Sequence, residues 1–264
     1  MSANYQVRWT PKPGLTALVK AGDAGLRYID FGILSLARGA RLAVPAAEKE
    51  TALVLLHGAA VIHGLGMPCT IGPRQSLFDE KPWTVMLPAG CGCEIEATAD
   101  AEIAVCQAPA NRRGEPRVIT PEQVKEMSLG RDNWQRTARI MVDENVPADF
   151  LFIGEAMTFN GNWSSYPPHR HEKDALPEEV DMEEIYYFRF DRPQGFGIQK
   201  VYTDDRSIDE TLTVQENDTI LVPRGYHPVV SAPGYSMYYL WVMAGKNRKF
   251  LSRLDPDHAW VANK

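Results

Sequence analysis

Short runs of β-branched and aromatic residues, separated by glycine and proline turns, recur along this chain of 264 residues. No helical period persists for long, so local pattern favours strands over helices. Spacings of this order predict an all-β protein that closes into sandwiches or barrels. In the first half the runs are Tyr28 to Leu36, Thr51 to Ile62, Trp83 to Leu87 and Cys93 to Pro109. In the second half they are Thr137 to Val142, Leu151 to Phe159, Glu184 to Phe190, Gly197 to Tyr202, Leu212 to Val214, Thr219 to Val222, Pro228 to Ser231 and Tyr235 to Met243.

Two similar turns indicate an internal duplication. MLPAGCG at 86–92 and LVPRGYH at 221–227 both place a hydrophobic pair before Pro-x-Gly, where a chain can turn sharply at the rim of a barrel. Between them, residues 111–133 change composition, and Thr120 followed by Pro121 predicts one short helix. We therefore predict two stacked antiparallel barrels, an N-terminal domain over residues 1–130 and a C-terminal domain over residues 131–264.

The charge distribution argues against nucleic acid as a partner. The chain carries 28 basic and 34 acidic residues, and the net charge of -6 belongs to its second half, mainly to an acidic run at 172–184. No basic stripe is present to contact phosphates. No apolar run is long enough to span a bilayer, so no membrane partner is expected. The four cysteines fit ordinary buried thiols, and we expect a cytoplasmic protein.

Three of the six histidines fall in one candidate site. His169 and His171 are two residues apart, so on a strand both imidazoles leave the same face. A downstream carboxylate and a third histidine, His227, can complete a metal site there. Glu172 is one choice of carboxylate, but it directly follows His171 and a strand would aim it the other way. Glu184, which opens a hydrophobic strand, is the other.

The arrangement H-x-H, then a carboxylate opening a strand, then D-x-x-x-x-P-x-G-x-H resembles the paired motifs of the cupins. The resemblance implies that His169, His171, Glu184 and His227 are metal ligands, with Asp218 beginning the second motif. Two spacings depart from the cupin pattern: the gap from His171 to Glu184 is longer, and the second motif is one residue shorter before His227.

A closer resemblance covers the chain from about residue 25. GNWSSYPPHRH, EEIYYFRF, GFGIQKVYTDD, VPRGYHPVVSAPGY and AGKNRK with DPDHAW occur in the order found in the 5-deoxy-glucuronate isomerases of myo-inositol catabolism. That family is similar to the ketol-isomerases of pectin breakdown. The resemblance implies a bicupin, with metal only in the second barrel, that interconverts an aldose and a ketose on a small deoxy uronic acid. Trp241 departs from the family pattern, which has Asn there, so a different substrate stays open if this position faces the cavity.

Moving a carbonyl from C1 to C2 needs a proton to leave C2 while negative charge builds on two oxygens. A divalent ion can stabilise that charge without redox chemistry, and three imidazoles with one carboxylate suit zinc, manganese, iron or nickel. No glycine-rich dinucleotide loop is present, so no organic cofactor is expected. By strand parity Tyr186 shares the inward face with Glu184, which makes it a candidate acid or base, and Glu172 is a second candidate. Lys200, Arg206 or Arg224 are candidates to bind the substrate carboxylate.

Alternatives remain for several of these residues. Tyr186 could be a core aromatic with a satisfied hydroxyl, and Arg224 could pair with the acidic run, itself either a solvated loop or a lid. His57, His63 and His258 fit no motif. A cupin dioxygenase or other oxidoreductase is the competing enzyme class, and a sugar-sensing bicupin is the non-enzymatic one, although no helix-turn-helix pattern precedes the barrel. The sequence leaves open a homo-oligomer.

Overall fold

The computed structural model describes residues 4–263. Within that range it contains 24 strands, all paired antiparallel, and four short 3-10 helices. The predicted all-β class is confirmed. No helix in the described part of the chain is both long and apolar enough to cross a membrane. The helices are η1 (Asp23–Gly25), η2 (Pro121–Gln123), η3 (Asp132–Trp134) and η4 (Ala259–Asn263).

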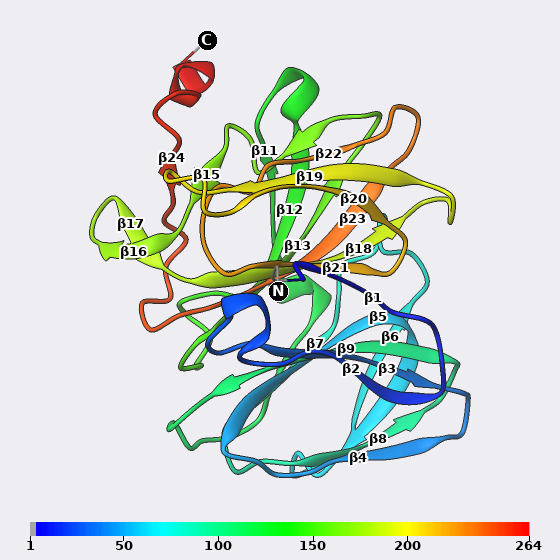
Figure 1. The fold of residues 1–264 in the computed structure, drawn as a ribbon. Coiled ribbons are helices and arrows are strands. Elements are labelled where there is room, and N and C mark those ends of the chain that lie inside the picture. Colours follow the sequence, from blue (N-terminus) through cyan, green and yellow to red (C-terminus); the bar gives the residue numbers. More distant parts are fainter. Residues whose placement is uncertain (1–3, 264) are drawn as a thin grey trace.

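Two barrels are stacked on each other, with the first drawn in blue and cyan and the second in green to orange (Figure 1). The first is built from one nine-stranded sheet. Its strands are β2 (Gly14–Val19), β3 (Asp30–Leu36), β4 (Arg41–Val44), β5 (Lys49–His63), β6 (Cys69–Arg74), β7 (Thr84–Leu87), β8 (Cys93–Ala97), β9 (Ala101–Pro109) and β10 (Arg117–Ile119).

The second barrel has a seven-stranded sheet facing a four-stranded one. The larger sheet runs in the order β1 (Gln6–Arg8), β21 (Asp218–Val222), β18 (Glu183–Phe190), β23 (Met237–Ala244), β13 (Leu151–Thr158), β12 (Arg136–Val142) and β11 (Lys125–Leu129). The smaller one runs in the order β14 (Trp163–Ser164), β22 (Val229–Ser231), β19 (Phe196–Tyr202) and β20 (Asp209–Gln215). Two further pairs lie at its edge: β15 (His169–Arg170) with β24 (Arg253–Leu254), and β16 (Glu172–Ala175) with β17 (Glu179–Asp181).

The chain passes from one barrel to the other between β10 and β11. β10 still pairs with β7 of the first barrel, whereas β11 already pairs with β12 of the second. The one-turn helix η2 lies between them and begins at Thr120 with a capping box, as the Thr-Pro sequence predicted. The N-terminal strand β1 also joins the second barrel, through β21. The division at residue 130 stays a prediction, and sheet membership changes a few residues before it.

Strand parity sorts the side chains of the larger sheet between two cores. Ile185 and Tyr187 of β18 point toward the first barrel and join an apolar cluster that also contains Phe31. Tyr186 and Phe188 point into the second barrel instead. One sheet therefore both seals the contact between barrels and lines the interior of the second barrel.

Two buried glutamates hold the barrels together by a reciprocal arrangement. Glu50, at the start of β5, accepts hydrogen bonds from the backbone N–H groups of residues 149–151 in the second barrel, at 2.6 to 2.9 Å. Glu183, at the start of β18, accepts three from residues 27–29 in the first barrel, at the same range of distances. Arg74 and Glu155 add a buried ion pair of 2.8 Å between the barrels. This symmetry supports the predicted internal duplication.

Candidate metal centre

A cavity of about 360 Å³ opens inside the second barrel. Inward-facing residues of the larger sheet line one wall, including Ala138, Tyr186 and Trp241. The loop that carries His169 and residues 249–254 of the C-terminal segment also line it. Its volume lies within the usual range for small-molecule sites.

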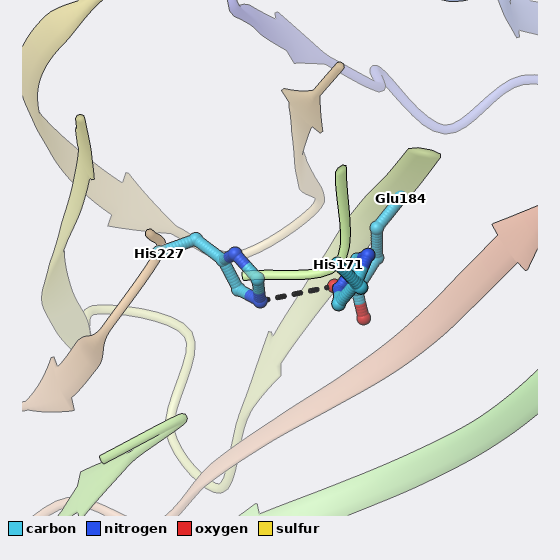
Figure 2. Close-up of side chains that lie close together, drawn as sticks. All are labelled: His171, Glu184 and His227. Atoms are coloured by element: carbon cyan, nitrogen blue, oxygen red, sulfur yellow. Dashed lines mark hydrogen bonds and ion pairs between the residues drawn. The ribbon is translucent and has the colours of Figure 1, made fainter. Parts of the chain in front are cut away.

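Three side chains from separate elements converge beside this cavity, and two of them, His171 and Glu184, line it. The candidate ligand atoms of His171, Glu184 and His227 lie within 4.8 Å of one another, and all three residues are buried. His171 follows β15, Glu184 is the second residue of β18, and His227 follows the Pro-x-Gly turn after β21. Figure 2 shows His227 approaching from one side and His171 beside the carboxylate of Glu184.

The turn before His227 depends on its glycine. Gly225 has a φ of +94°, and a Cβ there would lie 2.5 Å from the carbonyl oxygen of Tyr202. Only glycine fits this backbone and this close approach. The backbone N–H of Tyr226 donates to the carbonyl of Tyr202 at 2.7 Å, and the N–H of Tyr202 donates back to the carbonyl of Tyr226 at 2.9 Å. The turn is therefore held firmly, and His227 with it.

Both buried imidazoles are oriented by backbone carbonyls. Nδ1 of His171 contacts the carbonyl oxygen of Met182, and Nδ1 of His227 lies 2.9 Å from that of Gly225. A carbonyl only accepts, so each Nδ1 carries the hydrogen and donates it. Nε2 of each ring is thereby directed at Glu184 Oε2, at 3.0 Å for His171 and 3.2 Å for His227. Three potential ligand atoms therefore converge on one point, where a proton or a metal ion can lie between them.

The charges of the cluster follow from these contacts. Burial by itself would raise the pKa of Glu184, but its contacts with the two imidazoles hold that pKa at about 2. Burial opposes a charge on His171, yet its hydrogen bond with Glu184 raises the pKa of the imidazole above the usual 6.5. A proton can therefore fill the gap in the metal-free protein, and a divalent ion would compete with it.

His169 lies beside this cluster and completes a ring of three imidazoles. Its ring centre is 5.0 Å from that of His227 and 6.3 Å from that of His171. Burial and the two neighbouring imidazoles lower the pKa of His169 well below 6.5, so the ring is neutral and one of its two nitrogens keeps a free lone pair. His169 lies outside the group of converging ligand atoms, and its place in the four-ligand set stays a prediction.

Tyr186 faces the cavity between the cluster and the second tyrosine of the wall. Its hydroxyl lies 2.7 Å from Ser165 Oγ, and its ring stacks on Tyr239 with centres 4.5 Å apart. Its ring also stands nearly perpendicular to that of His227, 5.7 Å away. Burial and then the charge of Glu184 raise the pKa of Tyr186 well above 10, so the hydroxyl is protonated at neutral pH and can donate.

Glu172 lies outside the lining of the cavity. Its carboxylate lies 3.5 Å from Arg170, whose guanidinium also contacts Glu179 and Asp204. Arg170 stands between the two histidines of the H-x-H pair, so its side chain leaves the opposite face. It thereby ties the strand of His169 and His171 to the acidic segment that follows.

The three cations predicted to bind substrate also lie away from the cavity lining. Lys200 pairs with Asp209 at 2.9 Å, and Arg206 lies 3.6 Å from the same carboxylate. Arg224 donates to Ser207 at 2.7 Å and is 42% exposed. The cations that do line the cavity are Arg136 and Lys249, which the sequence did not single out. Arg136 shares strand parity with the inward Ala138, a signal that could have found it.

Trp241, the departure noted in the sequence, lines the cavity. It stacks on Phe152 and on Phe250, with ring centres 5.9 and 6.0 Å away, and those two rings also stack on each other at 5.9 Å. Gly154 on the neighbouring strand makes room for it, because a Cβ there would lie 2.0 Å from the indole. This aromatic group fixes the C-terminal segment against the cavity.

Comparison with known proteins identifies the family. The model of the KduI/IolB family matches residues 8–261. This chain belongs to the KduI/IolB family. It is 43% identical over 250 residues to the 5-deoxy-glucuronate isomerase of Geobacillus thermodenitrificans, covering 94% of this chain and 91% of that protein. It is 39% identical to the 5-deoxy-glucuronate isomerase of Bacillus subtilis strain 168, covering 93% and 92%. The resemblance stated from the sequence motifs is confirmed.

Solved structures agree with this family assignment. An IolB-like protein from Salmonella typhimurium has a TM-score of 0.94 at 36% identity and covers 98% of this chain and 100% of its own. The oxalate decarboxylase of Lactobacillus farciminis has a TM-score of 0.71 at 12% identity, which shows a shared fold alone. The predicted bicupin fold is confirmed for this member of the KduI/IolB family.

Proposed function

We propose that this protein is a metal-dependent aldose-ketose isomerase that converts 5-deoxy-D-glucuronate to 2-deoxy-5-keto-D-gluconate in myo-inositol catabolism. Relatives that carry the name 5-deoxy-glucuronate isomerase share 37 to 44% of their residues with it over nearly the whole chain. The single observation that supports the metal requirement is the convergence of two buried imidazole Nε2 atoms on one buried carboxylate. The cytoplasmic location stays a prediction, and a homo-oligomer stays open.

His171, Glu184 and His227, with His169 beside them, would hold a divalent zinc, manganese, iron or nickel ion. Such an ion supplies a positive charge that stabilises the negative charge on substrate oxygens while the proton moves between C2 and C1. The residues support this role because they offer nitrogen and carboxylate donors fixed by backbone contacts before any ion binds.

Tyr186 is the proposed proton donor to a substrate oxygen. Its protonated hydroxyl faces the cavity beside the candidate ligands, and Ser165 orients it. Glu172 remains the second candidate, but its contact with Arg170 supports a role in holding the loop more than one in proton transfer. The largely apolar wall around Trp241 would exclude water during the transfer.

The test is turnover of 5-deoxy-D-glucuronate by purified protein, followed by NMR in light and deuterated water. We expect the metal-loaded protein alone to form 2-deoxy-5-keto-D-gluconate, with partial loss of a C2 deuterium label to water. Removal of the ion by a chelator should stop turnover, and its return should restore it. Consumption of oxygen in place of isomerisation would overturn the proposal in favour of a cupin oxidoreductase.

A further inference from the structure

One cation on the cavity wall has no anionic partner. Arg136, the first residue of β12, lines the cavity and is half-buried. Its Nη1 reaches only two backbone carbonyl oxygens, those of Trp134 and Tyr166, each at the long distance of 3.4 Å. Among residues 4–263, no carboxylate forms an ion pair with it.

The arginines with buried side chains pair with carboxylates, and the half-buried Arg248 donates to four backbone carbonyls, those of residues 143, 146, 148 and 151. Arg74 and Arg139 both pair with Glu155, at 2.8 and 3.1 Å. Arg170 contacts three carboxylates. Arg136 has neither arrangement, only two long contacts, so most of its N–H donors stay available in the cavity and point to an anion supplied by the ligand.

Arg136 also stands close to the candidate metal centre. Tyr166, which accepts from its guanidinium, belongs to the loop that delivers His169, and both residues line the same cavity. A small sugar acid carries its reacting carbonyl at one end and its carboxylate at the other. One molecule in this cavity can therefore meet the metal ligands with the first end and Arg136 with the second.

Lys249 is the competing anchor because it lines the cavity too. It is exposed to solvent, where water and salt screen its charge. The planar guanidinium of Arg136 can also donate two parallel hydrogen bonds to a carboxylate, whereas an ammonium acts as a point charge.

We propose that Arg136 binds the carboxylate of the substrate and thereby sets the preference of the enzyme for uronic acids over neutral sugars. This inference rests on the proposed function, since it takes the substrate to be a sugar acid. It replaces Lys200, Arg206 and Arg224 in that role.

The test compares kcat/KM for 5-deoxy-D-glucuronate with that for its neutral analogue, in which a primary alcohol replaces the carboxylate. Arg136→Gln should lower kcat/KM for the acid on the order of 10- to 100-fold, mainly through KM, and leave the neutral analogue nearly unchanged. Arg136→Lys should recover part of the loss. Arg38→Gln, which removes an exposed charge from the first barrel, is the matched control and should change neither. Unchanged metal content and melting temperature would show that the variants are folded.

Equal losses on both substrates would overturn the inference, because a carboxylate anchor acts on the acid alone. It would also be overturned if Lys249→Gln or Arg224→Gln, and not Arg136→Gln, removed the preference. A binding measurement separates this result from failure of the proposed function. D-glucuronate should bind the wild type more tightly than D-glucose does, and Arg136→Gln should abolish the difference even if no substrate is turned over. Equal binding of the two sugars by the wild type would refute the role of Arg136.

Discussion

Replacing Glu184 by glutamine keeps the shape of the side chain but removes its charge from the centre of the candidate site. A glutamate with a pKa of about 2, against an ordinary value of 4.5, gains stability from being ionised in the folded state. That difference in pKa corresponds to about 3 kcal/mol of folding stability at neutral pH, and water screens it little because Glu184 is buried. For a protein of this size, Glu184→Gln should lower the melting temperature of the metal-free protein by roughly 5 to 10 °C.

Urea unfolding of metal-stripped wild type and Glu184→Gln measures this effect. The folded pKa is depressed, so the stabilisation is present above pH 4.5 and is lost as the pH falls toward 2. The difference in unfolding free energy between the two proteins should therefore be constant near neutrality and narrow below pH 4.5. Glu178→Gln, an exposed change in the same acidic run, should show no such difference. A gap under about 1 kcal/mol at pH 7, or one that persists unchanged at pH 3.5, would refute the reasoning.

Metal provides a second readout of the same variant. Zinc or manganese at 100 times its dissociation constant should stabilise the wild type by about 2.7 kcal/mol, because only the folded state offers the converging ligands. Glu184→Gln should gain much less at the same concentration. Equal gains would mean that the ion binds elsewhere.

His227→Ala should weaken metal binding by about 100-fold, if the free energy of metal binding is shared among four ligands. Metal titration should find a smaller loss of affinity in His169→Ala, because His169 lies outside the close cluster. His57→Ala, at an exposed position of the first barrel, is the control and should bind metal like the wild type. Glu183→Ala should destabilise the protein by about 3 to 5 kcal/mol in urea, since it leaves three backbone N–H groups without their acceptor. Trp241→Ala should lower the free energy of unfolding by about 3 to 5 kcal/mol and raise KM, because it removes the ring that packs on Phe152 and Phe250. Trp241→Phe should keep most of the stability and a KM near that of the wild type. Calorimetry measures the first quantity and steady-state kinetics the second.

The strands and turns of this chain could be predicted because their signals are local. Alternation of inward and outward residues, the Thr-Pro start of η2 and the Pro-Arg-Gly turn before His227 all act within a few residues. The pairing of β1 with β21 could not, because Gln6 and Ile220 meet only through tertiary contacts that no short pattern encodes. The same limit applies to the cations predicted to bind substrate. Arg206 and Arg224 lie next to motifs in the sequence, but which cation lines the cavity depends on how distant strands pack, and neither of these two does.

The long gap between His171 and Glu184 also has a structural explanation. Residues 172–181 fold into the hairpin of β16 and β17, which leaves the barrel and returns to it. On return, Met182 exchanges two contacts with His171: its N–H donates to the carbonyl of His171 at 2.9 Å, and its own carbonyl receives the imidazole hydrogen. The hairpin therefore ends at Met182, which orients the imidazole of His171. Two residues later, β18 presents the carboxylate of Glu184. Because Glu184 has the same parity as Met182 on an extended chain, the hairpin can lengthen the spacing without turning the carboxylate away from the cavity.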